Sequence, residues 1–372
     1  MVSVISGLFK SAQKQLTEWK VEPYLHFEPH RVYNPLKDRE IPFDDLFFGT
    51  ARAFLNGETS FKTLPTLLQE RLISDEWVIR PDTATDDRFL IKFVSLEANV
   101  ACNQSCYFCP VSVTRRTDNV MSLELYENIV QQLTAYKDTL QVVFMNHYNE
   151  PTVDKFFVDR VRILKKHGLQ PALLTNGSGL TPRRIDALVE MGGVRFLSVN
   201  LSTIDRERYV KERGQDQMEM ILRNLEYAKD KRLADDMGVI VLGMSDENHE
   251  RDYQEISARF AGTNFKVTKY QVDSRSQFFD FGDMPMEPIK HLRGCEQTGS
   301  RPLQHLHVTG EAKAILCCQD YHSEYVVGDL NTQTVDEVLK GAAMGLMRRW
   351  VYGLEEAPED FICRRCTFAL AR

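Results

Sequence analysis

Three cysteines in one short loop place the strongest constraint on this sequence. Cys102, Cys106 and Cys109 have the spacing C-x3-C-x2-C and lie just after an apolar run at 93–96. A loop of this kind can hold an iron–sulfur cube by three thiolates and leave one iron open to a small molecule. Structural zinc is the alternative, but it normally takes four ligands, and no fourth Cys or His is close in sequence. Unligated cysteines are a further alternative, against which the tight spacing argues.

The remaining cysteines form a second group towards the C-terminal end. They are Cys295, Cys317, Cys318, Cys363 and Cys366. Disulfides are disfavoured in a reducing cytosol, where clustered cysteines are more often metal ligands. Seven of the eight cysteines would be used if one cluster takes three and another takes four. The sequence therefore predicts two metal centres.

Composition narrows the class of protein. With 372 residues the chain can form two or more domains, and its 43% hydrophobic and 27% charged residues are ordinary for a globular protein. A net charge of −7 argues against a nucleic-acid partner held by its phosphates. No apolar run approaches the roughly 18 residues of a membrane span, and the first residues lack the features of a secretory signal. We expect a cytoplasmic enzyme with neither nucleic acid nor membrane as a partner.

From residue 91 onwards, strand-like apolar runs alternate with helical patterns. Strands are expected at 93–96, 142–145, 172–174, 196–201, 239–242 and 265–270, and helices at 123–136, 156–167, 182–191, 218–229 and 253–260, with Ser122 and Thr181 as N-caps. Six such repeats predict parallel strands with right-handed crossovers. Because a closed barrel needs eight, the predicted fold class is α/β with a partial (β/α)6 barrel. Active residues should then lie at the C-terminal strand ends.

Two further segments flank this barrel, which we assign to residues 91–275. Residues 1–90 predict a small α+β module, winged-helix-like, with an amphipathic helix from Val2 to Trp19, helices at 43–55 and 64–73, and a short strand at 77–79. Residues 276–372 begin with a linker and predict a hairpin around Thr309 and Gly310, then a helix from residue 334.

Polar residues and glycines lie near the ends of the predicted strands. They are Asn149, Glu150 and Pro151 after the second strand, Thr175 and Asn176 after the third, Ser198, Asn200 and Ser202 around the end of the fourth, and Gly238 to Gly243 on the fifth. Each could simply end a strand, form a turn or lie in solvent. Together, behind a cysteine loop with Phe108 before its last cysteine, they resemble the motifs of radical S-adenosylmethionine (radical SAM) enzymes over residues 91 to about 271.

The resemblance implies a role for each motif. Asn149, Glu150 and Pro151 take the place of a Gly-Gly-Glu-Pro segment that meets the cofactor's methionine amino group, with Asn replacing the second glycine. Ser198, Asn200 and Ser202 would contact ribose or the cofactor carboxylate. Thr175 and Asn176 belong to a segment familiar from the family. Gly243 ends a stretch near adenine that is one residue longer than the family pattern.

The chemistry implied is radical formation. A [4Fe–4S] cluster, reduced by a protein such as flavodoxin or ferredoxin, delivers an electron to S-adenosylmethionine, and the resulting 5′-deoxyadenosyl radical abstracts a hydrogen from substrate. We assign no catalytic acid or base.

The C-terminal cysteines resemble a SPASM or twitch extension, which holds auxiliary [4Fe–4S] clusters through C-x9–15-G-x4-C and C-x2-C elements. Fourteen residues separate Cys295 from Gly310, within the family interval, but six rather than four separate Gly310 from Cys317. Cys317 is preferred over its neighbour Cys318 as a ligand. The C-x5-C-x3-C element of a full SPASM domain is not found, so one auxiliary cluster is expected. A zinc ribbon is the alternative.

Three functions remain open. Related enzymes with such extensions modify ribosomally synthesised peptides or proteins, and the leader of about 90 residues favours a maturase of this kind. The second is a small-molecule dehydrogenase of the aminocyclitol or sugar type. The third is a non-catalytic iron–sulfur or zinc protein.

Overall fold

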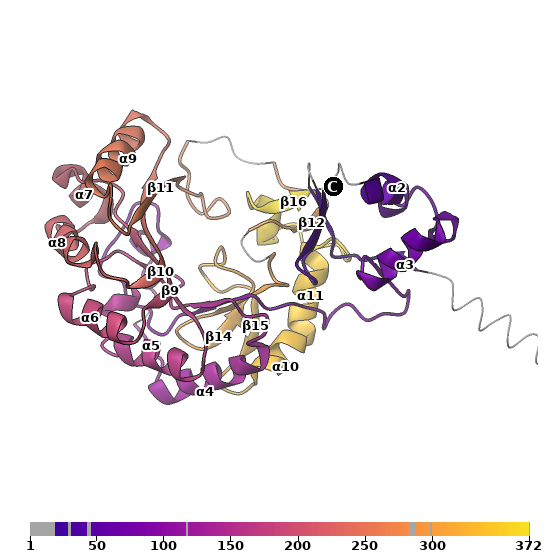
Figure 1. Cartoon of the computed structure of the whole chain (residues 1–372), viewed down its shortest axis with the longest axis horizontal. Coiled ribbons are helices and arrows are strands. Elements are labelled where there is room, and N and C mark those ends of the chain that lie inside the picture. Colours follow the sequence, from indigo (N-terminus) through magenta and orange to yellow (C-terminus); the bar gives the residue numbers. More distant parts are fainter. Residues whose placement is uncertain are drawn as a thin grey trace, which may run out of the picture.

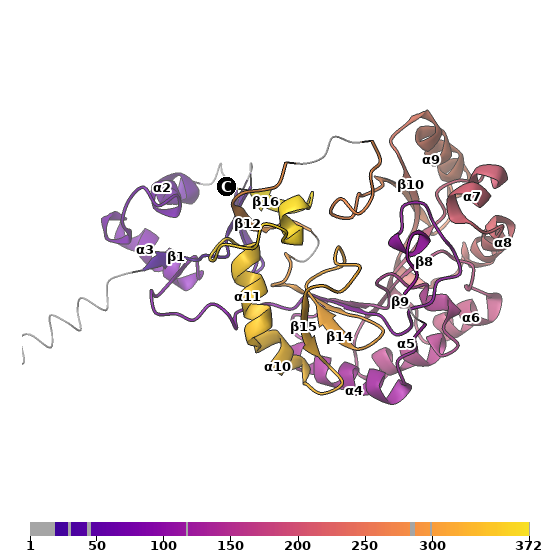
Figure 2. The same cartoon turned by 180° about the vertical axis from the view of Figure 1, so that it is seen from behind.

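The computed structural model describes residues 19–28, 31–42, 46–116, 118–282, 287–297 and 300–371. The helix predicted from Val2 therefore lies outside the described residues, apart from its last residue, Trp19. The described chain forms a curved sheet with helices along its outer side and an N-terminal module at one end (Figures 1 and 2). No helix among the described residues is long and apolar enough to cross a membrane.

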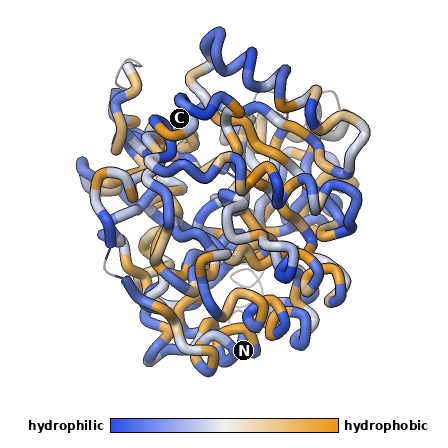
Figure 3. The backbone as a smooth tube through the Cα atoms, turned by 90° about the vertical axis from the view of Figure 1, so that its left-hand side faces the viewer, coloured by the Kyte–Doolittle hydropathy of each residue, from blue (hydrophilic) through white to orange (hydrophobic). Residues whose placement is uncertain are grey.

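The six predicted barrel strands are confirmed, and neighbouring strands pair in parallel in chain order. They are β6 (Phe93–Leu96), β7 (Val142–Phe144), β8 (Pro171–Thr175), β9 (Val194–Asn200), β10 (Ala234–Gly243) and β11 (Lys266–Gln271). The five predicted helices are α4 (Leu123–Leu133), α5 (Phe157–Lys166), α6 (Pro182–Glu190), α8 (Met218–Ala228) and α9 (Glu247–Arg259). These helices bury a few residues each, most of them apolar, and leave the rest of their surface more accessible, as expected where one face packs on a sheet. Hydrophobic and hydrophilic residues are interspersed along the backbone (Figure 3).

Helix starts agree only in part with the predicted caps. The Ser122 hydroxyl accepts a hydrogen bond from the Leu125 amide, as an N-cap should. Thr181 occupies the N-cap position of α6, but its side chain makes no capping bond. α9 begins six residues before the predicted start, because the Asp246 side chain caps it through the His249 amide. A further helix, α7 (Arg206–Arg213), was not predicted, because its strongly charged sequence shows no apolar stripe.

The predicted C-terminal hairpin is confirmed, and it extends the barrel sheet. β13 (His305–Val308) pairs in parallel with β6, and β14 (Lys313–Ile315) and β15 (Val326–Asp329) follow in antiparallel order. The result is one sheet of nine strands, in the order β11-β10-β9-β8-β7-β6-β13-β14-β15. Because β13 and β6 end side by side, the cysteine loop after β6 faces the turn after β13.

Helices and short strands complete the C-terminal region. They are α10 (Val335–Lys340), α11 (Ala342–Val351), the 3-10 helix Ile362–Arg365, and the pair β12 (Leu292–Cys295) and β16 (Ala369–Ala371). Thr334 and Glu337 form a reciprocal capping box at the start of α10.

The N-terminal module is α+β, as predicted, but contains more strands than expected. β2 (His26–Glu28), β3 (Arg31–Asn34) and β4 (Arg39–Pro42) form an antiparallel sheet, and β1 (Lys20–Val21) pairs with β5 (Val78–Ile79). The helices are α2 (Leu46–Leu55) and α3 (Thr66–Ser74). The module has a hydrophobic core of its own, separate from the barrel core. Its winged-helix character stays a prediction.

Candidate functional site

The cysteine loop is held against the end of α7. The backbone amides of Ser105 and Tyr107 donate to the carbonyls of Arg213 and Glu212, over 2.9 and 3.0 Å. These carbonyls belong to the last turn of the helix, where they lack partners within it. The missed helix therefore fixes the position of the loop.

The thiols of the loop are shielded from water. Burial raises the pKa of Cys102 to about 12 and that of Cys109 to about 11. Without a cation, these thiols stay protonated at neutral pH. A metal centre removes such protons, because a coordinating thiol is deprotonated outright. The loop therefore suits a metal cluster better than a free nucleophile.

Arg213 connects the loop to the end of β9. Its side chain is almost fully buried and donates to the sulfur of Cys106 at 3.4 Å and to Asn200 Oδ1 at 2.8 Å. It also donates to the Ser202 hydroxyl, and its guanidinium carbon lies 4.9 Å from the centre of the Phe108 ring. Two predicted cofactor residues, Asn200 and Ser202, are thus brought to the cysteine loop by a residue that the sequence analysis did not single out.

Replacing Arg213 with methionine should loosen this connection. We expect Arg213→Met to lower the iron bound per chain and to weaken binding of S-adenosylmethionine by about tenfold, since hydrogen bonds to charged groups contribute about 1.5–3 kcal/mol. Iron analysis and equilibrium dialysis measure the two effects. The exposed Arg206 on the same helix pairs with Asp216 and supplies the control, Arg206→Met. Equal behaviour of the two variants would contradict the prediction.

Glu150 organises the ends of β7 and β8. Its buried carboxylate accepts hydrogen bonds from the Thr175 hydroxyl and the Asn176 amide, both at 2.6 Å, and from the Thr152 amide at 3.0 Å. Burial raises the pKa of Glu150, and these donors oppose the rise. The Asn176 side chain in turn donates to Asn103, within the cysteine loop, at 2.8 Å. Three predicted cofactor residues, Glu150, Thr175 and Asn176, thus connect the ends of β7 and β8 to the cysteine loop.

The other predicted cofactor residues are more spread out. Pro151 starts a short 3-10 helix. Ser198 lies inside β9, opposite Gly238 on β10, rather than at the strand end. Gly243 ends β10, where a Cβ atom would lie 2.5 Å from the His249 ring, so the close approach requires glycine.

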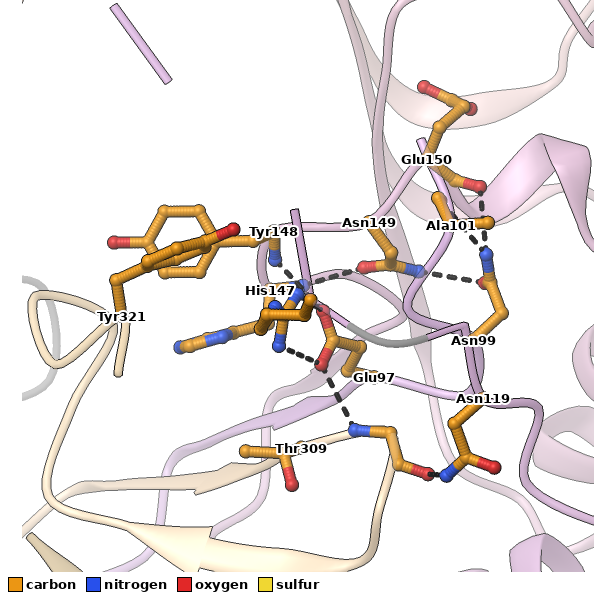
Figure 4. A network of polar contacts seen from close by, with 12 residues as sticks. Glu97, Asn99, Ala101, Asn119, His147, Tyr148, Asn149, Glu150, Thr309 and Tyr321 are labelled. Carbon is orange, nitrogen blue, oxygen red and sulfur yellow. Dashed lines mark hydrogen bonds and ion pairs between the residues drawn. The ribbon is translucent and has the colours of Figure 1, made fainter. Parts of the chain in front are cut away.

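Glu97 forms the centre of a polar network beside these residues (Figure 4). Its carboxylate is fully buried and accepts two hydrogen bonds from Arg116, at 2.6 and 2.8 Å, and one from the Tyr148 amide at 3.1 Å. A fourth comes from the Gly310 amide, in the turn after β13, at 3.0 Å. Burial favours a higher pKa for Glu97, but Arg116 outweighs it, so the pKa is lowered. The network ties the barrel to the C-terminal region.

Asn149 extends this network towards the cysteine loop. It accepts a hydrogen bond from the His147 amide at 2.9 Å and donates to Asn99 at the same distance. Asn99 donates to the carbonyl of Ala101, next to the first cysteine, at 3.1 Å. The residue that replaces the family's second glycine therefore supports the turn after β7.

Four of the C-terminal cysteines surround one small pocket, which Arg301 also lines. They are Cys295, Cys317, Cys363 and Cys366. Burial raises the pKa of each of these thiols. The residues that line the pocket do not include Cys318, whose sulfur instead accepts a hydrogen bond from Arg301 at 3.0 Å.

The thiols suit clusters better than single ions. Among the described residues, no three Cys, His, Asp or Glu side chains are placed to hold one metal ion. A tetrahedral zinc ion needs its four ligands at about 2.0–2.3 Å. In a [4Fe–4S] cube each thiolate binds a different iron, so the sulfurs lie farther apart.

Two tyrosines connect the regions that carry the two cysteine groups. The Tyr148 hydroxyl, from the barrel, donates to the carbonyl of Cys318, and the Tyr321 hydroxyl, from the C-terminal region, donates to the carbonyl of Thr114. Their rings lie 4.8 Å apart, edge to face. The two cysteine groups are thus neighbouring parts of one site.

A partial parallel barrel with a cysteine loop after its first strand and a second cysteine group beside it defines a class of iron–sulfur protein. Comparison with protein families also identifies the chain as an iron–sulfur protein. Residues 96–256 match the radical SAM superfamily, and residues 295–367 match SPASM, an iron–sulfur cluster-binding domain. The chain belongs to the radical SAM enzymes with a C-terminal SPASM domain. Its cofactors are a radical SAM [4Fe–4S] cluster, S-adenosylmethionine and SPASM-bound auxiliary iron–sulfur.

Curated relatives match parts of the chain. S-adenosyl-L-methionine-dependent 2-deoxy-scyllo-inosamine dehydrogenase of Niallia circulans is 30% identical over 111 residues, 29% of this chain and 44% of the relative. The tungsten-containing aldehyde ferredoxin oxidoreductase cofactor-modifying protein of Pyrococcus furiosus is 29% identical over 102 residues, 27% of this chain and 28% of the relative. The chain thus spans less than half the length of these two relatives.

Solved structures share the fold at low identity. Streptococcus suis SuiB bound to precursor peptide SuiA has a TM-score of 0.55 and 10% identity, covering 94% of this chain and 93% of SuiB. Native anSMEcpe with bound AdoMet has a TM-score of 0.52 and 13% identity, covering 74% and 87%. The first comparison includes the N-terminal module.

Proposed function

We propose that this radical SAM enzyme modifies a ribosomally synthesised peptide or protein, with one auxiliary [4Fe–4S] cluster in electron transfer. The observation that carries the proposal is the N-terminal α+β module, which has its own hydrophobic core beside the partial barrel. SuiB, whose fold covers 94% of this chain, is a protein solved with its precursor peptide. None of the module's described residues lines the cysteine pocket, so the module is suited to substrate recognition.

In this proposal the residues divide into three sets. Cys102, Cys106 and Cys109 hold the cluster that generates the 5′-deoxyadenosyl radical when S-adenosylmethionine is bound. The S-adenosylmethionine site comprises Asn149, Glu150, Pro151, Thr175, Asn176, Ser198, Asn200, Ser202 and Gly243. The auxiliary ligands are Cys295, Cys317, Cys363 and Cys366.

The protein's own part is to position and shield. Glu150 and Asn176 fix the strand ends against the cysteine loop, and Arg213 offers a buried cation beside Asn200 and Ser202, where a carboxylate or ribose hydroxyl would find donors. Tyr148, Tyr321 and Val111 form a buried cluster against Cys102 and Cys109. Exclusion of water protects a radical from side reactions.

The first experiment tests radical chemistry. Anaerobically reconstituted and reduced protein should convert S-adenosylmethionine to 5′-deoxyadenosine and methionine, and a variant with serine at Cys102, Cys106 and Cys109 should not. Chromatography of the products measures both. Absence of 5′-deoxyadenosine from the wild type would support a non-catalytic protein instead.

The second experiment separates the substrate classes. Candidate precursor peptides, encoded beside the enzyme, and aminocyclitols are offered in parallel, and mass spectrometry follows the loss of hydrogen. The 30% identity to the Niallia circulans dehydrogenase favours the aminocyclitol as the alternative. Oxidation of the aminocyclitol without any peptide modification would overturn the maturase proposal.

A further inference from the structure

A strained turn lies between the two cysteine groups. Arg275, Ser276 and Gln277 have φ angles of 55°, 55° and 66°, three successive non-glycine residues in the left-handed region. This conformation costs about 1–2 kcal/mol for each residue with a Cβ atom. Such strain persists only where the surrounding structure holds it, and it clusters at ligand sites.

The turn contacts both halves of the site. The Ser276 hydroxyl lies beside the sulfur of Cys366, one of the pocket cysteines. The Arg275 guanidinium carbon lies 5.9 Å from the centre of the Tyr148 ring, and Cys109 and Cys318 lie within electrostatic range of the guanidinium. The backbone therefore carries Arg275 into the region where substrate must meet both centres.

Arg275 has unused hydrogen-bonding capacity there. Its nearest carboxylate, Asp273, lies 3.9 Å away, too far for a hydrogen bond, and that carboxylate already accepts a bond from Gln319 at 2.7 Å. Its Nε is buried and has no hydrogen-bond partner among the described residues. Yet 31% of the side chain remains accessible. By contrast, Arg116 makes two hydrogen bonds to Glu97.

We propose that Arg275 anchors a carboxylate of the substrate, either an Asp or Glu side chain or a peptide C-terminus. This inference rests on the proposed function and specifies its substrate. The planar guanidinium fork matches a carboxylate with two parallel hydrogen bonds. A cation is also needed because the iron–sulfur centres carry negative charge, and a carboxylate near them would otherwise be repelled. The left-handed turn fixes the backbone position of Arg275 before substrate arrives, which reduces the entropy lost on binding.

Two carboxylate probes test the anchor in the cluster-loaded, reduced protein. One is the capped peptide Gly-Gly-Glu-Gly-Gly with ¹³C in the Glu carboxylate, and the other is N-acetyl-pentaglycine with ¹³C in its free terminal carboxylate. Pulsed electron paramagnetic resonance should detect ¹³C coupled to a reduced cluster with at least one probe at millimolar concentration. Which probe responds tells a side chain from a C-terminus. Arg275→Gln should weaken binding by about tenfold or more.

The control is Arg115→Gln, which removes an exposed guanidinium bonded to Ser105; it should bind the probes as the wild type does. Silence of both probes in the wild type, or equal binding by Arg275→Gln, would overturn the proposal. A fall in S-adenosylmethionine affinity in Arg275→Gln would also overturn it, since the guanidinium would then serve the cofactor. If Arg275→Gln holds no iron, Arg275→Lys replaces it: unchanged spectra with weaker probe binding support the anchor, and unchanged binding contradicts it.

Production of 5′-deoxyadenosine without probe binding would reject the anchor alone. Absence of 5′-deoxyadenosine would reject the proposed function itself.

Discussion

Replacing Cys317 with serine is expected to halve the iron bound per chain, from about eight atoms to about four, because a three-cysteine and a four-cysteine site each hold a four-iron cube. Cys317 lines the pocket together with the other three proposed ligands. Its sulfur also accepts a hydrogen bond from the Gln319 amide at 3.4 Å, a contact that helps to orient a ligand. Iron and sulfide analysis measures the loss, and resonance spectra of the reduced protein should lose one of two signals.

The neighbouring Cys318 supplies the matched control. Its sulfur accepts a hydrogen bond from Arg301, and its backbone carbonyl accepts one from the Tyr148 hydroxyl. Cys318→Ser should therefore keep all of the iron. If it loses a cluster while Cys317→Ser does not, the ligand assignment is reversed. Four irons and one zinc in the wild type would instead identify a zinc ribbon.

The fold could be predicted from the sequence wherever local pattern and burial agree. Strands β6, β7 and β8 are mostly buried and read as apolar runs, whereas β10 alternates buried with more accessible residues and β11 is mostly exposed. The helices of the barrel carry an apolar stripe. The pattern fails for α7, in which only Tyr209 and Arg213 are buried and the other residues are mostly charged. It also fails for the pairing of β13 with β6, because no local signal marks contact between strands about 200 residues apart.

The functional site could also be predicted from the sequence only in part. Cysteine spacing identified both groups, since metal ligands must be close in sequence or recur in pairs. No sequence pattern marks Arg213, which lies on the missed helix α7. Nor does any mark Glu97, whose partners Arg116, Tyr148 and Gly310 come from three separate segments. A lone glutamate after a strand looks like any surface residue until those segments are brought together.

Glu97→Gln is expected to destabilise the protein by about 3–5 kcal/mol, the usual cost of removing one partner of a buried ion pair. The substitution preserves shape but leaves the partly buried Arg116 guanidinium without its counter-charge and places an amide against the Gly310 N–H. Because the pKa of Glu97 is lowered below its ordinary 4.5, the stabilisation in the wild type is complete above that pH and is lost as the pH falls through the lower, folded-state value.

Chemical denaturation as a function of pH measures this difference. The stability gap between wild type and Glu97→Gln should be largest at neutral pH and narrow below pH 4.5. Glu127→Gln, at an exposed carboxylate paired with Lys166, is the control and should change little. A stability gap that stays constant into strong acid would contradict the prediction. It would show that the substitution acts through packing, and not through the charge by which Glu97 links the cysteine loop to the turn after β13.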